Sequence, residues 1–369
     1  MDEDLLTVRA TRRFRAVALL VAAVALGAAG CRAGVVADKA GGSVVVLRFA
    51  TIDNANPNGH TVAPQAFIDA VERLSGGRLH VDLQQSFESG AAGAESDIVK
   101  RLRAGTLDGG WPVTRAFARA GISGLEPIEA PMTLTNVAAE RALATGDGGR
   151  VLLATLHGTG VVGLGLTVGP LRRPWSTTGP LVAPGAWRSI AFRSYNSPVA
   201  DSTIRALGGR PTEASFPFPA LVRSGRLQGV ELDIAQYDHN HYADLLPWVV
   251  ANEVLWPRML VLSLSQKRWS TLTKRQRGWL TEAAQTAVSA SAAARYDEAP
   301  LAAGLCTFGV RFVDATPAEV TAMRRAVQPV IAALAADPET APGLAAVQAA
   351  VQTHPGVDGV HVPSRCRTR

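Results

Sequence analysis

The sequence predicts an α/β protein with two domains of the same class. Its 369 residues are 47% hydrophobic and 18% charged, a composition typical of a chain that folds around a sizeable core. Between residues 44 and 111, strand patterns alternate with helix patterns, and this order predicts a mostly parallel sheet covered by helices. A second series of strand and helix patterns begins near residue 161. We therefore expect a second sheet of the same kind.

The first thirty residues have the pattern of a secretory signal peptide. Four arginines precede an apolar run at 16–26, and small residues lead from there to Cys31. The run is shorter than a helix that crosses a bilayer, and its small-residue end is typical of a cleavage site. The AAGC sequence at 28–31 resembles a bacterial lipobox, which predicts a mature chain anchored through a lipidated Cys31. Plain secretion with an unmodified cysteine is the alternative.

The first domain is expected to follow a short tether at 31–43, which is small and polar. Its strands are recognised by β-branched or alternating residues, and its helices by apolar residues at helical spacing. The expected elements are a strand at 44–50, a helix from His60 to Gly76, a strand at 78–84, a helix at 95–103 and a short segment that ends at Trp111.

The second domain and the closing helices are expected from the same two patterns. A helical region interrupted by glycines precedes the second domain, and long helical patterns follow it. The expected elements are helices at 136–156 with a break at 146–149, strands at 161–168 and 189–194, a helix at 196–207, a short helix ending at 224, a strand at 227–233, a long helical pattern at 273–304, a strand at 310–313, and helices after 317 and at 341–352.

Charge and motifs exclude several kinds of partner. The formal charge is +6, and the basic residues are scattered along the chain, which argues against nucleic acid as a partner. The glycine-rich stretch at 90–93 lacks the lysine of a phosphate loop and the spacing of a dinucleotide fingerprint. His239 and His241 have no third ligand at a usual spacing. No cofactor and no metal are predicted.

Two cysteines remain when Cys31 is assigned to the lipid. Cys306 and Cys366 can pair in an oxidising compartment, where a disulfide would tie the tail at 356–369 to the domain. Two free buried thiols are the other interpretation.

One arginine carries the functional prediction. In the strand at 189–194, Ile190 and Phe192 point to one face and Arg193 to the other. Ligands of open α/β sheets collect beyond the carboxyl ends of the strands, and a guanidinium there can hold a carboxylate through two parallel hydrogen bonds. The local pattern also fits a surface arginine without a ligand.

Several segments in a fixed order resemble the extracytoplasmic solute-binding proteins of TRAP transporters, the DctP type. The strand with Arg193, the ALGG helix end at 206–209 and the segment ALVRSGRLQGVE at 220–231 carry the resemblance. It covers about residues 44–335, because His60, the segment at 105–108, Pro131 and the segment at 260–269 also agree with the family's pattern.

The resemblance implies two α/β lobes that close over a ligand, joined by crossing strands and a long helix. It also implies that Arg193 grips a carboxylate of that ligand. The implied boundaries are 44–166 plus about 256–300 for lobe I, 167–255 plus about 301–355 for lobe II, and 356–369 for the tail.

The sequence departs from the family in the motif expected to face Arg193. The family's Asp is Gln228 here, and its Asn, which commonly assists carboxylate binding, is Leu232, followed by Asp233. Glu231 or Asp233 can neutralise Arg193 and leave a pocket for a neutral or cationic solute. Alternatively, these acids point away and Arg193 binds an anion, which is the interpretation that we favour.

Aromatic residues are candidates for the walls of the cleft. Trp111, Tyr195, Phe216 and Trp256 lie near expected strand ends, where an aromatic side chain can contact a ligand or belong to the core. His60 is expected to cap or pack rather than to contact the ligand.

A binding protein without catalysis is the expected function. It would capture a small solute, an organic acid by preference, and deliver it to membrane permease subunits from the outer face of the cytoplasmic membrane. No Gly-x-Ser-x-Gly or comparable catalytic signature is present in the sequence. The alternatives are a ligand-sensing or ABC-type binding lipoprotein, a secreted or periplasmic form, and a secreted enzyme.

Overall fold

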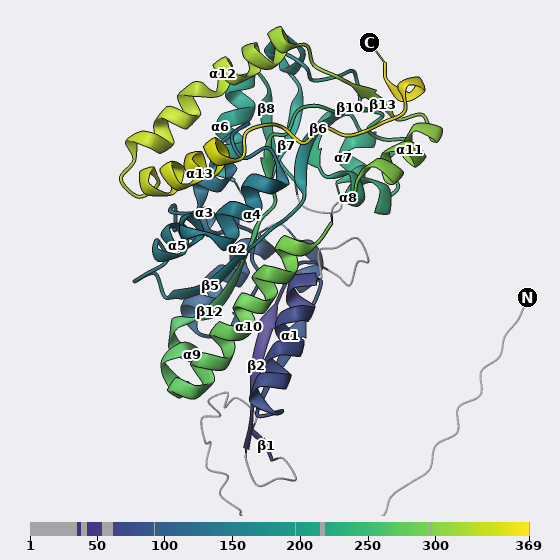
Figure 1. Ribbon diagram of the computed structural model, residues 1–369. Coiled ribbons are helices and arrows are strands. Elements are labelled where there is room, and N and C mark those ends of the chain that lie inside the picture. The colour runs from purple at the N-terminus through teal and green to yellow at the C-terminus, as the bar shows by residue number, and fades with distance from the viewer. Residues whose placement is uncertain are drawn as a thin grey trace, which may run out of the picture. The chain divides into compact units, whose positions relative to one another are not determined.

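Two mixed β-sheets, each with its own hydrophobic core, organise the computed structural model (Figure 1). All described residues belong to one compact unit, Val35–Arg369. The predicted signal peptide, Cys31 and His60 lie outside the described residues. The structure describes residues 35–37, 43–53, 62–91, 93–195, 197–214, 218–295 and 297–368.

The first sheet has the strand order β1-β2-β4-β12-β5, with β3 on the other side of β2. Strands β3 and β4 run parallel to β2, whereas β12 runs antiparallel to both β4 and β5. The strands are β1 (Val35–Ala37), β2 (Ser43–Ala50), β3 (Leu79–Gln84), β4 (Gly109–Gly110), β5 (Val161–Thr167) and β12 (Leu260–Ser265).

The helices that pack on this sheet complete lobe I, as we define it here. Helix α1 buries Phe67 and Val71 and lies against α10. The ring of Phe49 in β2 packs directly on Gly109. A Cβ at position 109 would lie 2.2 Å from this ring, so a larger residue does not fit there. The helices are α1 (Val62–Ser75), η1 (Phe87–Gly90), α2 (Ala94–Ala104), α3 (Ala116–Arg119), η2 (Glu126–Glu129), α4 (Val137–Thr145), α5 (Asp147–Ala154), α9 (Gln266–Thr271) and α10 (Lys274–Ala293).

The second sheet has the order β13-β10-β6-β9-β7-β8, with β11 paired to β6. Strand β7 runs parallel to β8 and β9, and β6 runs antiparallel to β9, β10 and β11. The strands are β6 (Leu171–Ser176), β7 (Ala191–Ser194), β8 (Arg210–Glu213), β9 (Gly229–Leu232), β10 (Trp248–Val250), β11 (Trp256–Pro257) and β13 (Arg311–Val313).

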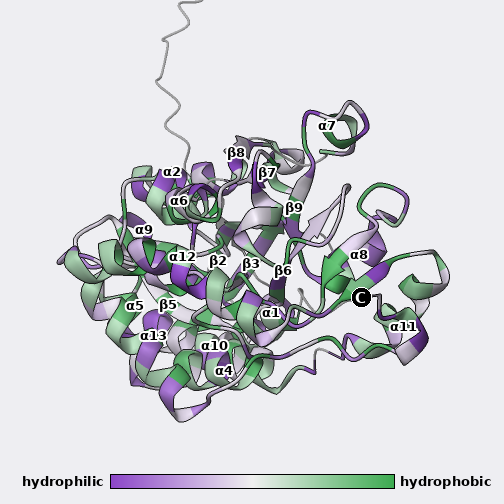
Figure 2. Ribbon diagram, turned by 90° about the horizontal axis from the view of Figure 1, so that it is seen from above, coloured by the Kyte–Doolittle hydropathy of each residue, from purple (hydrophilic) through white to green (hydrophobic). Residues whose placement is uncertain are grey.

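In the described part of the chain, lobe II consists of this sheet, four α-helices and two 3-10 helices, and the helices α12 and α13 connect the lobes. Helix α12 packs on α6 of lobe II, while α13 packs on α4 and α5 of lobe I. Seen from above, the outer helices carry hydrophilic and hydrophobic bands, the pattern of helices that cover a core (Figure 2). The helices are η3 (Pro184–Trp187), α6 (Pro198–Leu207), α7 (Pro219–Arg223), α8 (Ile234–His239), α11 (Ala299–Thr307), α12 (Pro317–Ala336), α13 (Ala341–Thr353) and η4 (Ser364–Cys366).

The predicted α/β class is confirmed, but the sheets are mixed where parallel strands were expected to dominate. Apart from the pair of β1 with β2, the antiparallel pairs all involve β5, β6, β11 or β12, which are the strands that carry the chain from one sheet to the other. A strand that leaves one sheet and enters the next without an intervening helix does not form a parallel βαβ unit. Local patterns identified these strands, but their direction depends on the crossing.

The chain crosses between the sheets at 168–170 and at 258–259. The two crossings touch, because a Cβ at Gly169 would lie 1.7 Å from the backbone oxygen of Arg258. The amide of Gly169 donates a hydrogen bond to Oε2 of Glu140 at 3.1 Å. Burial raises the pKa of Glu140 to about 8. Only a residue without a side chain fits at position 169.

The helical pattern expected at 273–304 forms two helices rather than one. Helix α10 ends at Ala293 and packs on lobe I, and α11 begins at Ala299 and packs on α8 of lobe II. Pro300 stands in the first turn of α11, where proline is tolerated, whereas inside a continuous helix it would remove a hydrogen bond. The predicted lobe boundaries stay a prediction.

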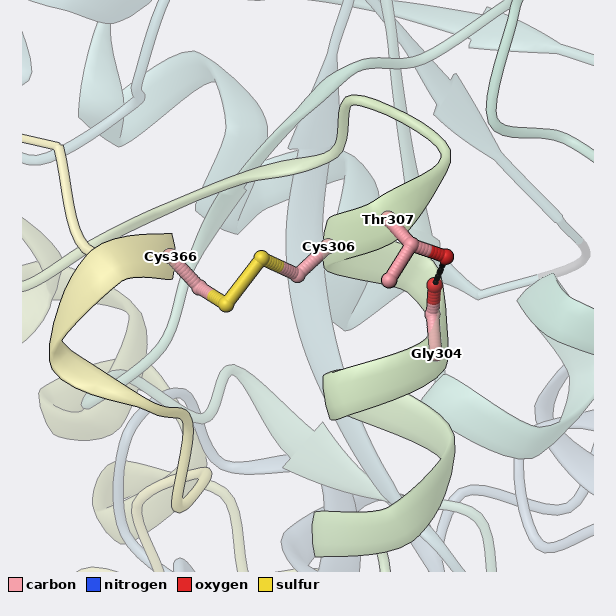
Figure 3. The surroundings of a disulfide bond; sticks show 4 residues. All are labelled: Gly304, Cys306, Thr307 and Cys366. Carbon is pink, nitrogen blue, oxygen red and sulfur yellow. Dashed lines mark hydrogen bonds between the residues drawn. A yellow bond between two sulfur atoms is a disulfide. The ribbon is translucent and has the colours of Figure 1, made fainter.

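A disulfide joins Cys306 of α11 to Cys366 of η4, with their Cα atoms 5.5 Å apart (Figure 3). The sequence had left pairing and free thiols open. The neighbouring amide of Thr368 also donates a hydrogen bond to the oxygen of Phe312 in β13. The C-terminal tail is thereby held on lobe II.

Candidate functional site

A pocket of about 380 Å³ lies between lobe I and lobe II. Four arginines line it, together with a tyrosine and several uncharged polar side chains. Lobe I contributes Ile52, Asp53, Ser86, Ser89, Gly90 and Arg115, lobe II contributes Arg172, Arg193, Tyr195, Gln236, His239 and Asn240, and the crossing between the sheets contributes Arg258.

Arg115 is held by a buried carboxylate of its own lobe. Its Nε and one terminal nitrogen donate hydrogen bonds to the two carboxylate oxygens of Glu95, at 3.0 and 3.2 Å. Both side chains are buried. Burial opposes the charge on Arg115, but Glu95 and Glu231 raise its pKa above the ordinary value. This geometry is that of a closed bidentate pair, which orients the arginine.

Glu231 on β9 lies among three guanidinium groups and is in close hydrogen-bonded contact with none. Its carboxylate oxygens are 3.6 Å from Nη1 of Arg193, 3.5 Å from Nε of Arg172 and 3.7 Å from Nη1 of Arg115. These distances exceed those of ordinary N–H···O hydrogen bonds. Within the described residues, Oε2 of Glu231 has no hydrogen-bond partner. One carboxylate is thus shared among three cations.

Arg193 lies in β7 with 1% of its surface exposed. Its Nε donates a hydrogen bond to the oxygen of Ala214 at 3.0 Å, and its guanidinium carbon lies 5.1 Å from the ring of Phe218. Burial lowers the pKa of Arg193 to about 10, so the group remains charged at neutral pH. Arg193 is therefore a fixed buried cation at the edge of the pocket.

Arg172 and Arg258 complete the set of four. Arg258 donates to both carboxylate oxygens of Asp53, at 2.8 and 3.2 Å. Arg172 lies 3.4 Å from a carboxylate oxygen of Asp233 and also donates to Gln236. The other oxygen of Asp233 accepts the amide of Gln236 at 2.7 Å and so caps α8. Asp233 therefore serves both a helix and an arginine.

The structure brings together part of the predicted site. Arg193, Glu231 and Tyr195 lie side by side, and Asp233 contacts the same cluster through Arg172. Trp111 lies instead in the core of lobe I, 5.2 Å from the ring of Phe49 and 5.5 Å from that of Phe67. Phe216 lies outside the described residues, and Trp256 lines a small cleft beside Arg193.

Sequence reasoning missed three of the four arginines. Arg115 is the residue before α3, Arg172 lies inside the crossing strand β6, and Arg258 directly follows the two-residue strand β11. Only the position of Arg258 just beyond a strand carried a signal, and such a position is common among surface arginines.

A fifth carboxylate, that of Glu129, lies beside two of the arginines. Glu129 accepts a hydrogen bond of 2.5 Å from the hydroxyl of Ser197, the N-cap of α6, and lines a small cleft with Arg115, Arg193 and Glu231. Burial raises the pKa of Glu129 to about 7, although Arg115 opposes this shift. The cluster thus sets four guanidinium groups against two carboxylates in bidentate pairs, Glu95 and Asp53, two at longer distances, Glu231 and Asp233, and Glu129, which is partly protonated at neutral pH.

A larger cavity of about 490 Å³ lies along the C-terminal segment. It is lined by the acids Asp297, Glu298, Asp314 and Asp358, and two of these form ion pairs with Arg173 and Arg367. Across the described ranges, no group of three or more His, Cys, Asp or Glu side chains is placed to hold a metal ion. This cavity is acidic, whereas the pocket between the lobes presents guanidinium groups.

Residues 49–337 match the model of the DctP family, described as bacterial extracellular solute-binding protein, family 7. The chain belongs to this family. The prediction made from the order of its motifs is thereby confirmed. In a comparison with curated proteins, nothing matches the chain.

Solved structures of TRAP periplasmic solute-binding proteins share the fold of this DctP-family chain. One from Ralstonia eutropha with bound (S)-2-acetolactate has a TM-score of 0.74 at 21% identity, over 84% of this chain and 99% of that one. One from Sulfitobacter with bound β-D-galacturonate has a TM-score of 0.72 at 20% identity, over 82% and 99%. One from Advenella mimigardefordensis with galactonate has a TM-score of 0.71 at 21% identity, over 83% and 99%.

The positions at which this chain departs from the DctP motif do not line the pocket. Gln228 accepts the amide of Ala191 at 2.8 Å and donates to the oxygen of Gly225, so it ties β7 to the turn before β9. Leu232 is fully buried in the core of lobe II. The departure therefore changes residues that support the site, while Arg193 lines the pocket and Glu231 lines the small cleft beside it.

Proposed function

We propose that this DctP-family protein captures a small organic acid in the pocket between its lobes and delivers it to the membrane subunits of a TRAP-type transporter. The observation that carries the proposal is the lining of a pocket of about 380 Å³ by four arginines. Guanidinium groups bind carboxylates in a planar, bidentate geometry. The ligands of the three similar structures, acetolactate, galacturonate and galactonate, are all carboxylic acids.

The pairing pattern favours an anion over a neutral or cationic solute. Arg115 and Arg258 are each matched by two hydrogen bonds to a carboxylate of the protein. Arg172 and Arg193 share Glu231 at distances of 3.5 and 3.6 Å. A ligand carboxylate can form shorter, charge-assisted hydrogen bonds with these two arginines than Glu231 does.

Export and lipid anchoring are part of the proposal. The family is extracellular by description, and the AAGC sequence before and at Cys31 resembles a lipobox. No helix in the part of the chain that the structure describes is both long and apolar enough to span a bilayer. We expect Cys31→Ala to release the protein from membranes into the soluble fraction, whereas continued membrane association of the variant would overturn the anchoring.

A thermal-shift screen tests the proposed ligand class. Galactonate, galacturonate, acetolactate and smaller acids are compared with galactose, galactitol and putrescine, which are neutral or cationic. A ligand that binds only the folded state raises the melting temperature. We expect shifts with acids alone. A shift with galactose or putrescine and none with any acid would show that Glu231 has converted the pocket to a different class of solute.

A further inference from the structure

Glu129 is a buried carboxylate that joins the two lobes beside the pocket. It is the last residue of η2 in lobe I, and 3% of its surface is exposed. Its Oε2 accepts the 2.5 Å hydrogen bond from the hydroxyl of Ser197 in lobe II. Arg115 and Arg193 line the same small cleft. A charge on Glu129 therefore acts on these guanidinium groups through the protein interior, where water screens little.

The cation closest in charge to Glu129 is already engaged by other acids. Arg115 donates to both carboxylate oxygens of Glu95 and lies 3.7 Å from Glu231. Among the ion pairs of the described residues, none includes Glu129. The charged and titratable groups that face Glu129 are Arg115 before α3, Glu95 of α2, Glu231 of β9, Arg193 of β7 and Tyr195 directly after β7. Glu129 is thus the acid of this cluster without an ion pair.

The charge balance of the cluster changes when an acid binds. Within the described residues, the pocket and the small cleft hold four guanidinium groups, and five carboxylates face them, so one negative charge is in excess when all are ionised. A ligand carboxylate adds a second. Excess negative charge in a buried site favours the protonation of one of its carboxylates.

Glu129 is suited to exchange this proton near neutral pH. Burial raises its pKa to about 7, and Glu231 and Glu95 add to the rise, while Arg115 and the hydrogen bond from Ser197 oppose it. The hydroxyl of Ser197 can donate to the ionised and to the neutral carboxyl group alike. Protonation therefore leaves the contact between the lobes in place.

We propose that Glu129 takes up a proton from the solvent when the pocket binds an anionic ligand, so that the capture of an acid is coupled to protonation and weakens as the pH rises. The inference rests on the proposed function, because it requires a ligand carboxylate beside the arginines. Coupling of this kind is reciprocal: the ligand raises the proton affinity of Glu129 by the factor by which the proton raises the ligand affinity. The ligand itself stays ionised above about pH 5.

Isothermal titration of the full chain counts the protons. D-galactonate and D-galacturonate are the probes, each titrated at about pH 7.5 in HEPES and in Tris at equal ionic strength. The two buffers differ in their heat of ionisation, so the difference between the observed enthalpies gives the number of protons taken up. We expect about 0.5 proton per ligand at this pH, and roughly tenfold tighter binding at about pH 6 than at about pH 8.5.

Glu129→Gln removes the titrating group and keeps an oxygen that accepts the hydrogen bond from Ser197. The uptake is expected to fall below about 0.1 proton, and the affinity to stay within about twofold of that of the unaltered protein at pH 6 over the whole range. Ser197→Ala is a second variant. Loss of its hydrogen bond removes an effect that lowers the pKa of Glu129, so the decline in affinity should move to higher pH.

His239→Gln is the matched control. His239 is an exposed residue that lines the pocket, and histidine is the side chain that most often changes its charge near neutral pH. Because water and salt screen an exposed charge, we expect this variant to keep most of the proton uptake. Urea unfolding at about pH 6 and 8.5 checks that each variant is folded.

Four outcomes would overturn the inference. They are binding of an acid without proton uptake, uptake that survives in Glu129→Gln, uptake that is lost in His239→Gln, and equal weakening of binding at every pH in Glu129→Gln. In these cases the proposed binding of acids stands and the role of Glu129 does not. If Glu129→Gln does not fold, the pH shift in Ser197→Ala and the uptake in His239→Gln decide. If no acid binds the unaltered protein, the proposed function fails together with this inference.

Discussion

The two sides of the pocket use buried arginines in different ways. On lobe I, Arg115 makes two hydrogen bonds of 3.0 and 3.2 Å to Glu95. On lobe II, Arg172 and Arg193 share Glu231 at 3.5 and 3.6 Å. The first pair is closed and positions a side chain, whereas in the second the shared carboxylate lies beyond hydrogen-bond distance of both guanidinium groups. Burial of an arginine therefore does not by itself identify a ligand anchor, because the closeness of its internal partner decides its role.

The largest effect is expected when the closed pair of Arg115 with Glu95 is broken. Arg115→Met leaves Glu95 buried without its cation, which costs about 3 to 5 kcal/mol of folding free energy. Urea unfolding without ligand measures this change. Arg119→Met is the matched control, because Arg119 is 41% exposed and lies 3.6 Å from Asp201 and from Glu213, and it is expected to cost less than about 1 kcal/mol. Equal losses in the two variants would show that the closed pair has no special structural role.

The second expected effect separates binding from stability. Arg193→Gln is expected to weaken binding of the tightest acid by about 100-fold, since the ligand loses a charge-assisted partner in a buried site. Glu231 keeps Arg115 and Arg172 as counter-ions, so the variant should still fold. Isothermal titration measures the affinity, with Arg223→Gln as the control, because Arg223 is an exposed arginine at the end of α7. Unchanged affinity in Arg193→Gln would remove Arg193 from the site.

A third carboxylate extends the comparison to a buried group without a hydrogen-bond partner among the described residues. Glu253 is 1% exposed, and neither of its oxygens has a hydrogen-bond partner in the described part of the chain. Burial raises its pKa from 4.5 to about 8. Below about pH 4.5, Glu253 is protonated in both the folded and the unfolded state. As the pH rises from there to about 8, only the unfolded state loses this proton, so the free energy of unfolding falls.

Glu253→Gln is therefore expected to reduce the decline in the free energy of unfolding between pH 5 and 8 by on the order of 2 kcal/mol. Urea unfolding at several pH values measures it. Glu282→Gln, at an exposed position of α10, is the control and should keep the pH dependence of the unaltered protein. An unchanged slope in Glu253→Gln would mean that other groups, such as Glu140 with its pKa of about 8, cause the decline.

The smallest expected effect tests the shared carboxylate directly. Glu231→Gln removes the charge with which a ligand carboxylate competes, so the affinity for the acid should rise by about tenfold. Glu95→Gln should change the affinity much less, because its partner Arg115 is already committed to lobe I. A loss of affinity in Glu231→Gln would mean that the carboxylate itself contacts the solute, as in the cationic alternative.

The sequence by itself determined most of the secondary structure and the family. Strands β2, β3 and β5, helices α1, α2 and α6, and the break between α4 and α5 follow from local hydrophobic spacing and from glycines at the ends of helices. These signals are local, because each depends on residues within a few positions of one another. Arg193 was found in the same way, as a charge at the end of an apolar strand.

The tertiary structure alone decided how the pocket is composed. Arg115, Arg172 and Arg258 come from segments far apart in the chain, and no local pattern distinguishes them from surface arginines. The separation of Trp111 from the pocket, the two-helix form of 273–304 and the direction of the crossing strands also depend on how the two sheets are connected. Spacing along the chain fixes which residues form an element, but the pairing of buried charges follows only from the packing of one lobe against the other.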